Sequence, residues 1–145
     1  MGIKGEITFP GDKSISHRAL MFAALAEGES RISNLSTGVD VQSTRKCLEA
    51  CGIKIRNDRN DVIVKGRKFS DPIEPLDCGN SGTTTRLLLG LLAGQGINAN
   101  FVGDKSLSAR PMNRILEPLF QMGLKCESHD GKLPITIRHY ILICP

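Results

Sequence analysis

The chain has 145 residues, 40% of them hydrophobic, and a formal net charge of +4 from 19 basic and 15 acidic residues. This length fits one domain with a core, whereas the mild positive charge, no Trp, one Tyr and five Phe argue against a nucleic-acid-binding surface. No apolar run is long enough to span a bilayer. Five cysteines without a C-x-x-C pair predict neither a disulfide framework nor a zinc site, so we expect a cytoplasmic chain without metal or cofactor. The mild positive charge leaves small anions as the expected ligands.

The first half of the chain predicts alternating strands and helices. The expected elements are a strand at 4–9, a helix at 16–27, a strand at 30–34, a helix at 40–51, and a hairpin with strands at 53–56 and 62–65. Gly28 and Gly52 follow the two helices, as glycine often does at a helix C-terminus. Asp40 is expected to N-cap the second helix.

Apolar spacing predicts which face of each helix is buried. The first helix has its apolar positions at Leu20, Met21, Ala24 and Leu25, and the second at Val41, Thr44, Cys47, Leu48 and Cys51. Cys47 and Cys51 are interpreted as core residues rather than as a metal-binding pair.

The second half repeats this order. The expected elements are a strand at 76–78, a helix at 81–93, a strand at 99–102, and a helix that begins at Pro111 and runs to about Met122. Gly123-Leu124-Lys125 echoes Gly52-Ile53-Lys54 at an offset of 71 residues.

The sequence therefore predicts an α/β (mixed-sheet α+β) fold of two repeated βαβαββ units, at about 11–68 and 75–138, with the polar connection 70–75 between them. Such units cover a mixed sheet with helices on one face.

The turn before the first helix, Gly11 to Arg18 (GDKSISHR), carries groups suited to an anion. A helix N-terminus offers unpaired N–H groups and partial positive charge. Lys13 adds a mobile cation, Ser14 a hydroxyl donor, and Arg18 a planar fork suited to a carboxylate. The alternative is that Ser14 or Ser16 caps the helix while the cations are solvated.

The turn before the third helix, Gly79 to Arg86 (GNSGTTTR), combines two glycines with a cluster of hydroxyls. This composition favours access of a ligand to the backbone. The alternative is a glycine turn in which Ser81 is the N-cap. Arg86 is interpreted as a support behind this loop.

A third segment, Gly103 to Pro111 (GDKSLSARP), repeats the GDKS letters before a following helix. Arg110 can point its guanidinium into a shared cleft there, unless the segment is an ordinary surface loop. His17 is interpreted as a capping or packing residue rather than an acid or base. No triad, H-E-x-x-H or paired-carboxylate pattern is found, so no catalytic residue is assigned.

Together these three segments resemble three motifs of the enolpyruvylshikimate phosphate synthase family, in that family's order. The resemblance implies transfer of the enolpyruvyl group of phosphoenolpyruvate to shikimate 3-phosphate with release of phosphate. It also implies a fold of two domains, each made of three βαβαββ units, in enzymes that are mostly monomeric.

By this resemblance, Lys13 contacts both substrates, while Ser14 and Arg18 hold the shikimate part. The phosphoenolpyruvate pocket is shaped by Asn80, Gly82 and Thr83, and Arg110 holds the anionic groups of that substrate. Neither a cofactor nor a metal is implied.

Two alternatives stay open. The sister enzyme that transfers enolpyruvyl to a UDP-sugar shares the fold, although its opening motif differs from DKSISHR. A non-catalytic domain that binds a small phosphorylated anion would also explain the cations.

Members of the family are longer than this chain, and several of their functional residues would lie beyond Pro145. Residues 138–145 do not resemble the family, as expected of a truncated or frame-shifted product. We therefore expect the chain by itself to be inactive.

Overall fold

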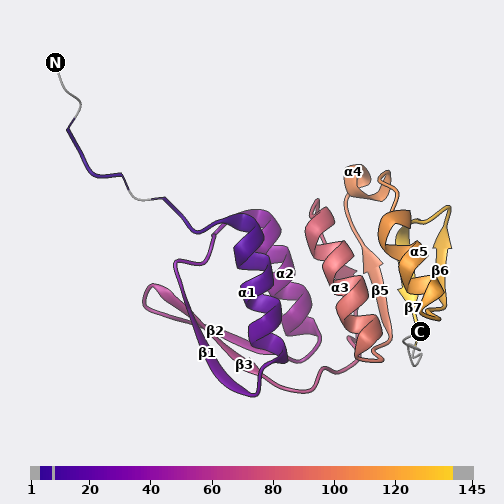
Figure 1. The fold of residues 1–145 in the computed structure, drawn as a ribbon, viewed down its shortest axis with the longest axis horizontal. Helices are drawn as coiled ribbons and strands as arrows, with labels where there is room; N and C mark the ends of the chain where they lie inside the picture. The colour runs from indigo at the N-terminus through magenta and orange to yellow at the C-terminus, as the bar shows by residue number, and fades with distance from the viewer. Residues whose placement is uncertain (1–3, 8, 139–145) are drawn as a thin grey trace.

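The structure is a computed structural model that describes residues 4–7 and 9–138. Figure 1 shows its helices lying on one side of two small sheets that stand side by side. The elements in chain order are α1 (Lys13–Leu25), β1 (Gly28–Ser33), α2 (Val39–Ala50), β2 (Lys54–Asp58), β3 (Asp61–Gly66), β4 (Leu76–Asp77), α3 (Gly82–Gly94), β5 (Ala99–Val102), α4 (Lys105–Ser108), α5 (Asn113–Gln121), β6 (Cys126–His129) and β7 (Lys132–Ile137).

The two sheets have the same strand order in each half of the chain. The first sheet is β1-β3-β2, all antiparallel, and the second contains the equivalent β5-β7-β6. The second sheet also has β4, which pairs with β5 in parallel. The predicted mixed-sheet fold is thereby confirmed, while the bounds of the two units as domains stay a prediction.

Corresponding helix ends support the repeat. Gly52 and Gly123, after α2 and α5, have φ of 89° and 92°, a region that favours glycine. The N–H of Ile53 donates to the carbonyl of Leu48 at 3.1 Å, and the equivalent bond from Leu124 is 2.8 Å. Each helix is closed by the same glycine turn, which directs the chain into a hairpin.

One continuous core joins the helices to both sheets. Leu20, Leu48, Leu89 and Phe101 are fully buried in it, on α1, α2, α3 and β5 respectively. The predicted apolar faces are confirmed except at Leu25, which lies at the end of α1 and is 44% exposed.

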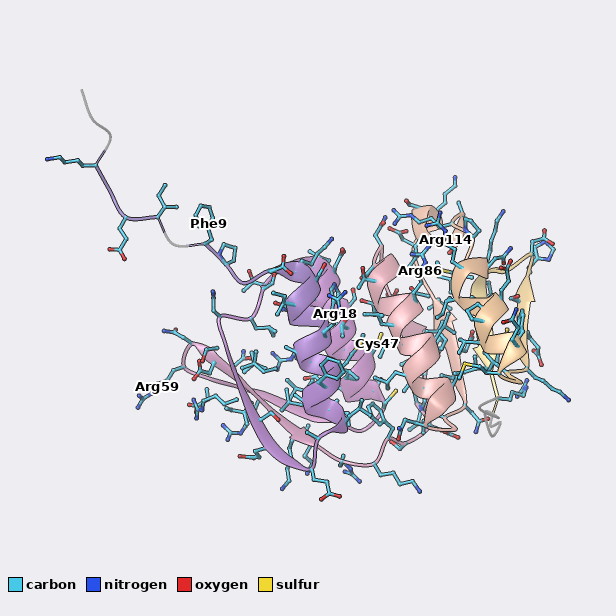
Figure 2. All side chains as sticks on the ribbon, in the orientation of Figure 1. Phe9, Arg18, Cys47, Arg59, Arg86 and Arg114 are labelled. Carbon is cyan, nitrogen blue, oxygen red and sulfur yellow. The ribbon has the colours of Figure 1, made fainter. Side chains whose placement is uncertain are left out.

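The predicted strand at 4–9 is wrong for the described residues. They form no strand, and Figure 2 shows Phe9 on a segment that projects away from the body of the molecule. Ile7 and Phe9 are 77% and 74% exposed. A strand needs a neighbour to accept and donate its backbone hydrogen bonds, and none of the described strands pairs with this segment.

Two predicted helix starts are also wrong. α1 begins at Lys13 because Asp12 is its N-cap, and the Asp12 carboxylate accepts a hydrogen bond from the Ile15 N–H at 2.7 Å. The N-cap of α2 is Gly38 rather than Asp40. Asp40 instead lies in the first turn, where its carboxylate binds Lys13.

The predicted helix from Pro111 to about Met122 is α5, which begins two residues later, and a separate short helix that the sequence did not predict precedes it. Asp104 caps the separate short helix α4, and Pro111 lies just before Met112, the N-cap of α5. Residues 139–145 of the atypical tail lie outside the described residues. In the part of the chain that the structure describes, every helix is too short or too polar to cross a membrane.

Candidate anion-binding site

The first turns of α1, α2 and α3 lie together at one edge of the molecule (Figure 1). Lys13 on α1 donates from Nζ to Asp40 Oδ2 on α2 at 2.9 Å. The Thr84 hydroxyl on α3 donates to the Asp40 carbonyl oxygen at 3.2 Å. Because helix N-termini carry partial positive charge, this edge is suited to anions.

The two GDKS tetrads fold locally in the same way. Asp12 accepts from Ile15 N, and Asp104 accepts from Leu107 N, each at 2.7 Å. In both, the aspartate is the N-cap and the following lysine is the first helical residue. The shared GDKS sequence therefore forms a helix start in both places. The neighbouring residues differ, because Lys13 binds Asp40 whereas Asp104 binds Asn80.

The predicted residues of the first turn lie on the surface of α1. The side chain of Lys13 is 57% exposed even with its ion pair to Asp40. Arg18 donates from Nη1 to the carbonyl oxygen of Ser14 at 2.9 Å. Ser14 and Arg18 are both exposed, so they are accessible to a ligand.

The glycine turn before α3 brings two guanidinium groups close to the backbone. Ser81 is the N-cap, and its hydroxyl oxygen accepts from Thr84 N at 3.1 Å. A Cβ added to Gly82 would overlap Nη1 of Arg86 and would lie 3.8 Å from Nη1 of Arg110. Glycine lets the Arg86 guanidinium lie against the backbone, since a Cβ here would displace it.

Asn80 ties this turn to the third predicted segment. Its Nδ2 donates to Asp104 Oδ2, and its Oδ1 accepts from Arg110 Nη2, each at 2.7 Å. The Leu107 N–H, with help from the Asn80 amide, holds the pKa of Asp104 below its usual value. Asp104 is therefore a carboxylate at neutral pH, and it helps to hold Arg110 in place.

Three arginines line an open pocket of about 410 Å³ beside this network. The lining residues are Arg86, Arg110, Pro111, Asn113 and Arg114. Arg86 donates from Nη2 to the Pro111 carbonyl oxygen at 3.3 Å. Figure 2 shows Arg86 and Arg114 near the N-terminal ends of α3 and α5. A lining with three cations and no carboxylate favours a multiply charged anion.

The sequence prediction did not include two of these arginines. Arg86, which the sequence predicts as a support of the loop, lies against Gly82 and also lines the pocket. Arg114 is not among the predicted residues, and its signal in the sequence is a basic residue in the first turn after Pro111.

The predicted residues thus form two groups along one edge. Asn80 and Gly82 lie within reach of Arg110, and Thr83 is half-buried in the first turn of α3 next to Gly82. The other group is that of α1, which does not line the arginine pocket. Asp40 on α2 connects the groups through its contacts with Lys13 and Thr84.

His17 is fully buried between the helices. Its Nδ1 lies 2.7 Å from Thr44 Oγ1, and its Nε2 has no hydrogen-bond partner among the described residues. Burial lowers the pKa of His17 below its usual value. The imidazole is therefore neutral at physiological pH and does not face the site as an acid or base.

Comparisons with known proteins agree on one family. A family profile described as EPSP synthase (3-phosphoshikimate 1-carboxyvinyltransferase) matches residues 1–142. The 3-phosphoshikimate 1-carboxyvinyltransferase of Bacillus licheniformis is 45% identical over 141 residues, which cover 94% of this chain and 33% of the relative. That of Koribacter versatilis is 50% identical over 139 residues, with the same coverage.

The fold is also found in a solved structure. The EPSP synthase of Acinetobacter baumannii superposes with a TM-score of 0.86 at 38% identity, over 92% of this chain and 32% of the other. The chain thus spans about a third of the length of the relatives that it matches.

Proposed function

Because the chain belongs to the EPSP synthase family, we propose that it forms part of a site that transfers the enolpyruvyl group of phosphoenolpyruvate to shikimate 3-phosphate. The observation that carries this proposal is the arginine pocket against Gly82, with a second cationic group on α1 at the same edge. Two multiply charged anions repel each other, so a site that joins them needs cations from separate elements.

The two groups have different roles in the proposal. Asn80, Gly82, Thr83 and Arg110 bind phosphoenolpyruvate at the start of α3. Ser14 and Arg18 bind shikimate 3-phosphate at the start of α1, and Lys13 contacts both substrates. Arg86 and Arg114 add positive charge beside the phosphoenolpyruvate end of the site.

The described residues near this site supply charge rather than proton transfer. Asp104 has a lowered pKa and is ionised, and His17 is buried and neutral. Protonation of the phosphoenolpyruvate methylene needs a general acid, and such groups typically contribute about 10² to 10⁴ in rate. We therefore expect the 145-residue chain to bind the substrates weakly and to release no phosphate from them.

Substrate binding can be tested by NMR on the 145-residue chain. Phosphoenolpyruvate should shift the backbone amides of Gly82, Thr83 and Arg110, and shikimate 3-phosphate those of Lys13, Ser14 and Arg18. Glucose 6-phosphate is the control anion and should shift neither set selectively. Arg110→Gln should abolish the response to phosphoenolpyruvate and preserve that to shikimate 3-phosphate.

Equal responses to all three anions would contradict the proposal and favour a generic binder of small phosphorylated anions. A response to a UDP-sugar in place of shikimate 3-phosphate would instead favour the sister transferase.

A cytoplasmic location and a monomeric state belong to the same proposal. Cys47, Cys51, Cys78 and Cys126 are free thiols, which supports a reducing compartment. Fractionation of the source cells and sedimentation of the purified protein test the two statements.

A further inference from the structure

A buried chain of side-chain hydrogen bonds, here called the seam, crosses from α1 to α3. His17 Nδ1 lies 2.7 Å from Thr44 Oγ1, which lies 2.7 Å from Thr84 Oγ1. Thr84 Oγ1 in turn lies 2.7 Å from Ser81 Oγ. All four side chains are at most 1% exposed, so water does not replace any of these contacts.

Each end of the seam adjoins a group of proposed binding residues. His17 precedes Arg18 in the first turns of α1, and Ser81 and Thr84 flank Gly82 and Thr83 at the start of α3. The seam also reaches the partner of Lys13, because Thr84 donates to the Asp40 carbonyl oxygen. A change in the seam would therefore move one group relative to the other.

One buried nitrogen of the seam has no hydrogen-bond partner among the described residues, which favours a positioning role over a purely stabilising one. His17 Nε2 is buried and unpaired among the described residues, which costs free energy of folding. Apolar side chains of similar shape would avoid this cost. Removal of the Thr44 hydroxyl would leave His17 Nδ1 without its partner and would take one of three contacts from Thr84 Oγ1.

We propose that His17 is a positioning residue: through Thr44 and Thr84 it fixes Gly82 and Thr83 at the start of α3 relative to Lys13 and its neighbours on α1. This inference rests on the proposed function, because the seam would set the separation between the two anionic substrates. The hydrogen bonds, rather than the bulk of the side chains, determine that separation.

Matched substitutions at Thr44 test the proposal in the 145-residue chain. Thr44→Val removes the hydroxyl and keeps the shape, whereas Thr44→Ser keeps the hydroxyl. Thr44→Val should shift the Gly82 and Thr83 amide signals and weaken phosphoenolpyruvate binding about tenfold, and Thr44→Ser should restore both. His17→Leu should shift the same two amides, although they lie on another helix.

The proposal is overturned if folded Thr44→Val retains the wild-type amide signals and affinity. It is also overturned if the valine and serine variants lose affinity equally, because shape would then be decisive. When the wild-type chain binds no phosphoenolpyruvate, the proposed function fails, and the Gly82 and Thr83 amide signals of the Thr44 and His17 variants still decide whether the seam fixes α3.

Discussion

The two halves of the chain, 13–66 and 76–137, share a strand order but differ in the segment before their first helix. In the second half, β4 pairs with β5 and Leu76 is 1% exposed. In the first half, Ile7 is 77% exposed, and the described residues of the equivalent segment pair with no described strand. The edge of β1 that corresponds to the β4-paired edge of β5 is unpaired among the described residues, so a strand-like pattern beside a free edge is not sufficient to form a strand.

The halves also differ in their following helix. α2 is one helix of 12 residues, whereas the second half has α4 and α5 with Arg110 and Pro111 between them. This break is where the arginine pocket opens. The departure from the repeat therefore creates the most cationic part of the site.

The largest difference in stability between the halves is expected from substitutions in the segments that precede α1 and α3. Leu76→Ala removes buried methyl groups and should lower the free energy of unfolding by about 2–5 kcal/mol. Ile7→Ala should change it by less than about 0.5 kcal/mol because the side chain is exposed. Urea denaturation measures both values. Equal losses would mean that Ile7 packs against the fold.

Alanine at the two GDKS glycines should have the next largest effect. A Cβ on Gly11 would overlap the backbone carbonyl oxygen of Asn34, so we expect Gly11→Ala to cost about 1–3 kcal/mol. On Gly103 the nearest atom is the side-chain Cδ2 of Leu107 at 2.6 Å and the nearest backbone atom is the Gly79 oxygen at 3.0 Å, so the cost should be smaller. Thermal unfolding measures both, and Gly5→Ala, which meets no atom within 4 Å, is the control.

The cap of α4 should give a pH-dependent effect. The pKa of Asp104 is lowered, so its contribution to stability is present above the unfolded pKa and is lost as pH falls through the folded pKa. The stability difference between wild type and Asp104→Asn should therefore shrink from about pH 6 to about pH 2. Denaturation across this range measures it, and a constant difference would contradict the assignment.

The ion pairs between Arg31 on β1 and the turn of the β2–β3 hairpin should give the smallest effect. Arg31 donates to Asp58 and Asp61, each at 2.7 Å, whereas near the turn of the second hairpin an exposed His129 Nε2 lies 3.7 Å from Asp130 Oδ2. Arg31→Gln should lower the melting temperature slightly in dilute buffer and not at about 1 M salt, since salt screens exposed charges. An effect independent of salt would point to packing instead.

Local signals explain which elements were predicted correctly from sequence. The strand β5 was expected at its observed bounds, and the hairpin β2–β3 in its observed place. The errors concern contacts with distant residues: the segment 4–9 pairs with no described strand, and Asp40 lies in the first turn of α2, where it binds Lys13.

In the candidate site, too, local sequence signals predicted some residues, while others depend on how distant elements pack. Helix starts identified Lys13, Gly82 and Arg110 as candidates, because anion-binding turns have local signatures. The approach of Arg86 and Arg114 to one pocket depends on how α3 and α5 pack, which single-sequence patterns do not encode. Thr44 was correctly expected to be buried, but its hydroxyl partners come from other helices.

The seam has a consequence for recombination between relatives. A chimaera that joins the first half of one enzyme to the second half of another inherits the helix starts of both, but it inherits matching hydroxyl partners only if both parents use the same set. Such a chimaera should therefore take all three seam residues, His17, Thr44 and Thr84, from the same parent. A crossover in the connection between β3 and β4 would separate Thr84 from the other two.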